Sequence, residues 1–156
     1  MPRYWLMKSE PNVFSIDDLG RAKNGTTRWD GVRNYQARNF LRDEIAVGDG
    51  VLFYHSSAEP PAVAGTARVV RAGYPDPTQF DARDGHHDPD SSKDDPRWYA
   101  VDIQFDAKFN RPVTLAELRA EKALAEMVLL RRGSRLSVQP VTPAEWKHIV
   151  KLGARA

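Results

Sequence analysis

The 156-residue chain contains no cysteine, which excludes disulfide bonds, thiolate metal sites and a cysteine nucleophile. No apolar run approaches the roughly 18 residues that a membrane-spanning helix needs. The start, MPRYWLMKSEP, lacks the apolar segment and cleavage site of a signal peptide. We therefore expect a cytoplasmic protein without membrane association. The phosphate-binding patterns G-x-G-x-x-G and Walker A are also missing, as is the G-x-S-x-G elbow of serine hydrolases.

Negative charge is concentrated in one stretch of the chain. Residues 76–97 hold seven of the 21 acidic residues and three of the 23 basic ones. The other residues include 20 basic and 14 acidic side chains, so they carry a net charge of about +6. Most of those cations are arginine, which suits phosphate and base recognition. An ordinary solvated surface explains the same excess of positive charge.

The order of expected elements indicates an α+β fold. Apolar runs predict strands, and capping residues predict helices that begin at Ser15, Asn34, Thr114 and Thr142. The Asn34 helix is expected to end near Glu44 and the last helix at Gly153. The expected strands are Arg3–Met7, Thr26–Trp29, Val51–His55, Ala62–Gly73, Trp98–Phe105 and Arg135–Pro140. Since no regular βαβ alternation is visible, residues 1–156 predict a single domain with a small, mostly antiparallel β-barrel surrounded by short helices.

The acidic segment, taken with the two residues before it as Tyr74–Arg97, is expected to be a long, mobile loop, because it also contains four prolines. His86, His87 and the aspartates are possible metal ligands. However, adjacent histidines rarely bind one metal together, and the spacing matches neither a zinc site nor a calcium loop. The pattern therefore favours a solvated loop, with no metal site and no cofactor.

Polar residues follow the first expected strand directly. Lys8, Ser9 and Glu10 leave a buried run together, which is typical of a pocket mouth and also of a surface turn. Four aromatic residues lie at the boundaries of expected elements, where their rings can sandwich a planar base or form part of the core with a wet polar end. They are Trp29, Tyr35, Tyr54 and Trp98.

Seven motifs, in order, carry a resemblance to a known family: YWLMKSEP, WDGVRNYQARNFL, GDGVLFYHS, GTARVV, PRWYAVDIQF, RPVTLAELRA and RLSVQPVTPAEW. They cover essentially the whole chain, which closely resembles the EVE domain family. The resemblance implies a PUA-like fold, related to the YTH and ASCH domains. It also implies a pocket that reads a modified base such as 5-methylcytosine in DNA or RNA. The positions that match the family's pocket motifs are Lys8, Ser9, Glu10, Trp29, Arg33, Asn34, Tyr35, Gln36, Tyr54, His55, Ser56, Trp98 and Ser137.

Within that resemblance, we expect Trp29 and Tyr35 to contribute an aromatic wall. Gln36 offers an amide to a base edge and ranks above Asn34, which the helix cap occupies. Glu10 is suited to accept from an exocyclic amine, and Arg33 to hold a phosphate or an internal carboxylate. Seven arginines are candidates for the flanking nucleic-acid backbone: Arg38, Arg42, Arg68, Arg71, Arg131, Arg132 and Arg135.

Two other functions stay open at this point. The first is a hydrolase or nuclease acting on a nucleotide, with His55 as acid, Glu10 as base and Lys8 as electrostatic stabiliser. The second is a small-molecule or protein-interaction domain. We expect the non-catalytic base reader. The sequence leaves open the choice between DNA and RNA, the modification and the oligomeric state.

Overall fold

The computed structural model describes residues 2–133 and 135–155. Across these residues, six strands form one sheet in the order β2-β5-β4-β3-β1-β6. Neighbouring strands are antiparallel except β1 and β3, which are parallel. The strands are β1 (Tyr4–Ser9), β2 (Thr26–Trp29), β3 (Gly50–His55), β4 (Ala62–Pro75), β5 (Tyr99–Thr114) and β6 (Val138–Val141). The α+β class predicted from the sequence is confirmed.

The helices are short, and several begin at the predicted caps. They are α1 (Ile16–Arg21), α2 (Tyr35–Asn39), α3 (Leu115–Ala120) and α4 (Pro143–Gly153). Ser15 and Thr142 form complete capping boxes with Asp18 and Glu145, and Asn34 Oδ1 accepts from the Ala37 N–H at 3.0 Å. Shorter helical turns are Lys23–Gly25, Phe40–Glu44, Pro77–Phe80, Lys122–Leu124 and Val128–Leu130.

Two expectations about the helices and strands are wrong in detail. Thr114 caps α3, but the predicted capping box is incomplete because the Glu117 carboxylate pairs with both terminal nitrogens of Arg111. The strand expected to end at Phe105 continues to Thr114 as β5, because it pairs with β4 along almost its whole length.

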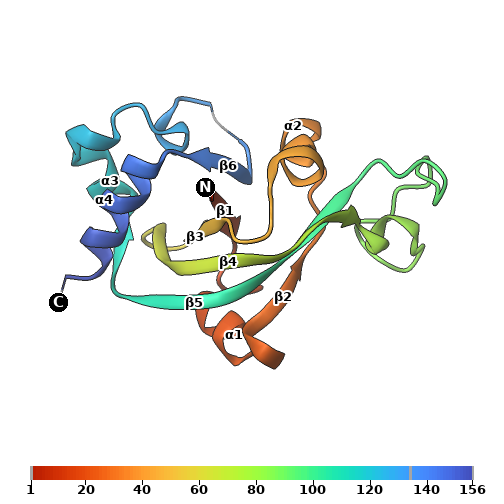
Figure 1. Ribbon diagram of the computed structural model, residues 1–156, viewed down its shortest axis with the longest axis horizontal. Coiled ribbons are helices and arrows are strands. Elements are labelled where there is room, and N and C mark those ends of the chain that lie inside the picture. Colours follow the sequence, from red (N-terminus) through yellow and green to blue (C-terminus); the bar gives the residue numbers. More distant parts are fainter. Residues whose placement is uncertain (1, 134, 156) are drawn as a thin grey trace.

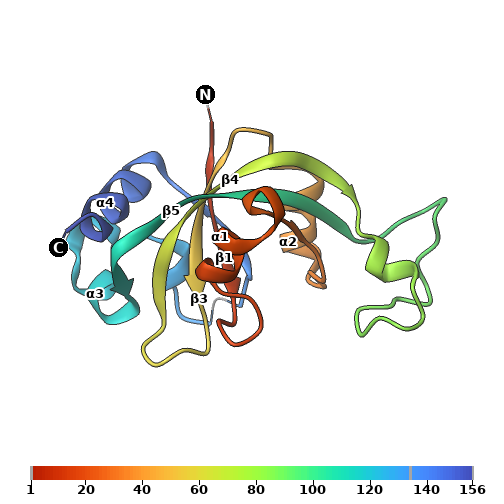
Figure 2. The ribbon, with the colours of Figure 1, turned by 90° about the horizontal axis from the view of Figure 1, so that it is seen from below.

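The expected small β-barrel is wrong in a larger respect, because the sheet that the structure describes does not close. Among the described strands, β2 and β6 are the two ends of the sheet and do not pair with each other, so the sheet stays open. Several register shifts interrupt the β4–β5 ladder. Such bulges bend the strands that carry them, and Figure 2 shows the two long strands arching across the molecule. The sheet is therefore curved without being closed.

Both faces of the central strands are buried. Trp5, Met7 and Phe53 lie in one apolar cluster, and the alternate residues Leu6 and Leu52 lie in a second cluster on the opposite face. This arrangement explains why β1 and β3 are continuous apolar runs rather than alternating ones. The second cluster lies where α3 and α4 cover one end of the sheet, and residues 76–97 extend from the other end (Figure 1).

Candidate functional site

A cavity of about 730 Å³ opens where β1 and β2 end. Its volume falls within the range of roughly 300–1,000 Å³ that small-molecule sites occupy. Residues 8–10 line it from the end of β1, and residues 27–33 from the end of β2 and the segment beyond. Its other lining residues are Val13, Phe14, His86 and Ser137. Ser137 is held beside β1 because its carbonyl accepts from the Lys8 N–H at 2.9 Å.

Aromatic rings form the apolar part of the cavity. Trp29 is only 8% exposed, and its ring packs edge-on against Phe53 with centroids 5.6 Å apart. The ring of Phe14 also packs against Phe53, tilted, with the centroids 6.5 Å apart. Because the core fixes these rings, they present a preformed apolar surface to a planar ligand.

Lys8 brings a positive charge to this cavity. Partial burial lowers the pKa of its ammonium group. Among the residues that the structure describes, Lys8 has no hydrogen-bond or ion-pair partner for its side chain. A half-buried cation without a partner favours the binding of an anionic or carbonyl oxygen.

The other two residues at the end of β1 differ from each other. The Ser9 hydroxyl donates to the Phe14 carbonyl, so it stabilises the turn after β1. The Glu10 side chain is exposed at the rim, with no partner among residues 2–133 and 135–155, while its carbonyl accepts from Val13 and Phe14. Glu10 is therefore the one of the two whose side chain remains available.

Arg33 is held entirely by the protein. Its guanidinium donates to Asp76 Oδ2 at 3.1 Å, to Thr78 Oγ1 at 3.0 Å and to the Val32 carbonyl at 3.0 Å. Two more hydrogen bonds, of 2.7 and 3.1 Å, go to the His86 carbonyl. All five N–H donors of a guanidinium are then used. The internal carboxylate foreseen for Arg33 is Asp76, whose side chain is fully buried.

Asp76 is the centre of this network. Burial acts to raise the pKa of its carboxyl group, but hydrogen bonds from Thr78, the Gly31 N–H and Arg33 outweigh burial and hold the pKa below its ordinary value. The Gly31 N–H donates to Oδ2 at 2.8 Å, and the Thr78 N–H and hydroxyl donate to Oδ1. Asp76 is therefore ionised at neutral pH and ties the segment after β2 to the acidic segment.

Most side chains of the acidic segment are exposed, as expected of a solvated loop, but the segment is anchored to the rest of the domain at a few buried residues. Gln79 is fully buried and bonds to the carbonyls of Asp76 and Trp98. Asp88 accepts from Trp98 Nε1 at 2.7 Å. These contacts place His86 at the cavity, against Gly31. The φ of Gly31 is +75°, which favours glycine, and a Cβ atom there would lie 2.8 Å from His86 Nε2 and displace the ring.

The four aromatic residues singled out in the sequence do not share one wall. Trp29 lines the cavity, whereas Tyr35 and Trp98 stack on each other outside it, with centroids 4.9 Å apart. The Arg33 guanidinium lies over Trp98, at 5.2 Å from the ring centroid. Tyr54 belongs to the second core cluster, where burial raises the pKa of its hydroxyl.

Four further candidates also lie outside the residues that line the cavity. Asn34 caps α2, and Gln36 is exposed on the same helix. His55 Nε2 accepts from the Ile16 N–H at 3.1 Å, and burial lowers the pKa of its ring. The Ser56 N–H donates to the Ser9 carbonyl. His55 accepts a hydrogen bond from the first residue of α1 and does not line the cavity, whereas Glu10 does. The two residues therefore do not form an acid–base pair there.

Sequence reasoning missed about half of the cavity. The missed residues are Val13, Phe14, Thr27, Arg28, Asp30, Gly31, Val32 and His86. Most of them adjoin residues that were singled out, so widening each motif by a few positions would have found them. No motif near His86 in the sequence points to the cavity, because only folding brings its ring beside Gly31.

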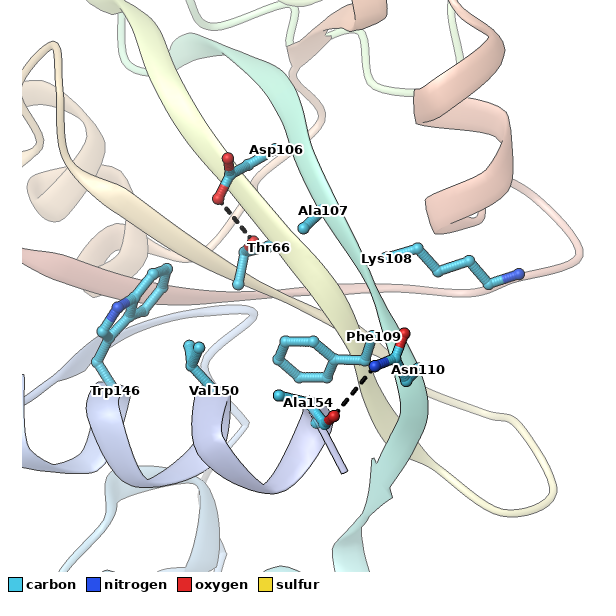
Figure 3. Close-up of a pocket in the computed structure, with 10 residues that line it drawn as sticks. Thr66, Asp106, Ala107, Lys108, Phe109, Asn110, Trp146, Val150 and Ala154 are labelled. Atoms are coloured by element: carbon cyan, nitrogen blue, oxygen red, sulfur yellow. Dashed lines mark hydrogen bonds between the residues drawn. The ribbon is translucent and has the colours of Figure 1, made fainter. Parts of the chain in front are cut away.

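A second cavity of about 360 Å³ lies between β5 and α4 (Figure 3). Trp146, Val150 and Ala154 face it from the helix, and Phe109 faces it from the strand. Its polar groups bond to nearby groups of the protein: Thr66 to Asp106 at 2.9 Å, and Asn110 to the Ala154 carbonyl at 3.0 Å. It contains none of the residues that the family resemblance implies, so the first cavity is the stronger candidate.

Two searches of the described residues concern metals and membranes. Residues 2–133 and 135–155 contain no cluster of three or more histidine, aspartate or glutamate side chains suited to hold a metal ion. In the same part of the chain, no helix has the length and apolarity needed to cross a bilayer.

The fold and the first cavity together define a small α+β domain that carries a ligand-sized, partly aromatic site at its strand ends. Residues 3–152 match the model of the EVE domain. The chain belongs to the EVE domain family.

Three similar proteins illustrate this relationship. Human thymocyte nuclear protein 1 is 45% identical over 166 residues, which cover 96% of this chain and 73% of that protein. A protein of solved structure from Pseudomonas putida is 51% identical, with a TM-score of 0.91 over 96% of this chain and 99% of that one. The solved structure of human THYN1 in complex with 5-methylcytosine containing DNA is 43% identical, with a TM-score of 0.91 over 99% of both chains.

Proposed function

We propose that this chain is a non-catalytic module that takes a modified base of the 5-methylcytosine type from DNA into the cavity at the ends of β1 and β2. One observation carries the proposal: a preformed cavity with aromatic rings and an unpartnered Lys8 occurs in a chain 43% identical to a protein solved with 5-methylcytosine containing DNA. The relative's ligand suggests the class of ligand, and the cavity suggests where it binds.

The chemistry of the cavity suits such a base. The rings of Trp29 and Phe14 offer apolar and stacking surface, worth about 1–3 kcal/mol for each stacked base. Glu10 is available at the rim to accept from the exocyclic amine of cytosine. A base in duplex DNA has to leave the stack to enter, which costs a few kcal/mol. The contacts within the cavity have to repay that cost.

Contacts to the flanking backbone come from cations outside the cavity. Arg131, Arg132 and Arg135 are exposed in the segment that leads to Ser137. Among the residues that the structure describes, Arg132 and Arg135 have no ion-pair partner. Free guanidinium groups in the segment that reaches the cavity at Ser137 support backbone binding that weakens as salt concentration rises.

Matched oligonucleotides test the proposal. DNA and RNA of one sequence, single- and double-stranded, carry cytosine, 5-methylcytosine or 5-hydroxymethylcytosine at one position, and affinity is measured at two salt concentrations. We expect the tightest binding to DNA with a modified cytosine, weakened at high salt. Equal affinity for modified and unmodified strands overturns the proposal. A preference for modified RNA would mean that the ligand is a modified base in RNA rather than in DNA.

The hydrolase reading has no such support. His55 is bonded to the Ile16 N–H and lies outside the cavity residues. We expect no turnover of nucleotides or oligonucleotides by the purified protein. Turnover that His55→Ala abolishes would contradict the proposed non-catalytic function.

A further inference from the structure

We propose that His86, carried by the acidic segment, is a specificity-determining residue of the base site and accepts a hydrogen bond from the ligand through Nε2. This inference rests on the proposed function, since it concerns the same cavity. It adds a residue that lies far from the others in the sequence, in a segment for which the family resemblance implied no role.

The position of His86 is fixed from three sides. Arg33 donates two hydrogen bonds to its carbonyl, at 2.7 and 3.1 Å. Asp84 Oδ1 accepts from its backbone N–H at 2.8 Å. The imidazole lies over Gly31, where the absence of a side chain makes room for it. These hydrogen bonds fix the backbone of residue 86 beside the cavity, and the half-exposed ring lies against Gly31 and within reach of Asp84 Oδ1.

The same contacts determine which ring nitrogen is free. His86 Nδ1 lies 3.2 Å from Asp84 Oδ1, and because an ionised carboxylate only accepts, Nδ1 is the donor. In the neutral ring, Nε2 is then an acceptor. Among residues 2–133 and 135–155, Nε2 has no hydrogen-bond partner. An oriented acceptor at the wall of a base site selects a ligand that carries a donor on its edge.

The exocyclic amine of cytosine is such a donor. It carries two N–H groups, so a hydrogen bond to His86 is compatible with another to Glu10. Thymine has the same 5-methyl group but a carbonyl in place of the amine. The ratio of the affinities for 5-methylcytosine and thymine therefore measures the contribution of the acceptor, His86 Nε2.

The chain offers a matched control in the adjacent histidine. His87 has the same side chain in the same segment but is not among the residues that line the cavity. His86→Ala is expected to weaken binding of 5-methylcytosine DNA about tenfold, as the loss of one hydrogen bond does. His87→Ala is expected to leave the affinity within about twofold. His86→Gln, whose amide oxygen reaches a similar position, is expected to restore most of it.

A double-mutant cycle with Gly31 tests the placement. A Cβ at residue 31 would lie 2.8 Å from His86 Nε2, and the ring is the end of a flexible side chain that can move away. Gly31→Ala also strains the backbone at φ +75°, so it is expected to weaken binding at least as much as His86→Ala does. In the double variant the loss is expected to be smaller than the sum of the two single losses, because both substitutions remove the contact to the ring. Unfolding curves verify that each variant is folded.

The experiment measures the affinity of the wild-type protein and these variants for duplexes with 5-methylcytosine or thymine at the central position, over a range of salt. We expect His86→Ala to lose preference for 5-methylcytosine without a change in salt slope, because the contact is to a base and not to a phosphate. Equal effects of His86→Ala and His87→Ala overturn this inference and leave the proposed function standing. Absence of binding by the wild-type protein overturns both.

Discussion

The guanidinium of Arg33 and the backbone carbonyl of His86, 53 residues apart in the chain, are joined by two hydrogen bonds. The same guanidinium pairs with the buried carboxylate of Asp76. Arg33 therefore fastens the acidic segment to the residues that follow β2. One wall of the cavity depends on this connection.

Arg33→Ala is expected to lower the free energy of unfolding by about 3–5 kcal/mol, because it leaves the fully buried carboxylate of Asp76 without its counter-charge. Urea unfolding followed by fluorescence measures the change. Arg28→Ala is the control, since the pair of Arg28 and Asp30 is partly exposed, unlike the fully buried Asp76 carboxylate, and is expected to be worth about 1 kcal/mol. Similar losses of unfolding free energy in the two variants would show that Arg33 does not hold the acidic segment to the residues after β2.

Asp76 makes stability depend on acid pH. Its carboxyl pKa is lower in the folded protein than the ordinary value of about 3.9, so the folded state binds fewer protons than the unfolded state in this range. The stabilisation is complete above the unfolded value and is lost as pH falls through the lowered, folded value. The difference in unfolding free energy between wild type and Asp76→Asn should therefore be largest at neutral pH and shrink on acidification.

Unfolding curves at a series of pH values measure that difference. Asp94→Asn changes one exposed charge in the same segment and serves as the control. A difference between wild type and Asp76→Asn that stays constant with pH would contradict the role given to Asp76.

Lys8→Met is expected to weaken binding of 5-methylcytosine DNA at least about tenfold, because the cavity loses its unpartnered cation. Its salt slope identifies the contact: a phosphate contact lowers the slope by about one, and a base oxygen leaves it unchanged. Lys108→Met is the control, since Lys108 pairs with Asp17 away from the cavity. Unchanged affinity in Lys8→Met would remove Lys8 from the site.

Asn34 and Gln36 form another matched pair. Asn34→Ala is expected to lower the free energy of unfolding by about 1 kcal/mol, because the cap of α2 is lost. Gln36→Ala is expected to change it by less than about 0.5 kcal/mol, since Gln36 is exposed. Thermal or urea unfolding compares the two, and equal losses would contradict the capping role.

The local features of the fold were predictable because they depend on neighbours in the sequence. Ser15, Asn34 and Thr142 cap helices as expected, and β3 is buried on both faces as its apolar run indicates. Whether the sheet closes depends on the pairing of β2 and β6, which no local pattern encodes.

The site likewise has residues that local sequence patterns predicted and residues that only distant contacts bring in. Lys8, Ser9, Glu10 and Trp29 line the cavity because they lie at or next to the end of a strand that the sequence reveals. The composition of residues 76–97 resembles that of a solvated loop, since its anchors, Asp76 and Gln79, look like any other polar residues until the chain folds. Their partners are distant in sequence, which explains why His86 was treated as part of a loop.

Photo-crosslinking tests the central claim most directly. A duplex that carries 5-iodocytosine in place of 5-methylcytosine is irradiated with the protein, and mass spectrometry locates the adduct. We predict an adduct on Trp29, Phe14 or His86, which surround the proposed base position. An adduct on Phe109 or Trp146, in the cavity between β5 and α4, would contradict the assignment of the base to the first cavity.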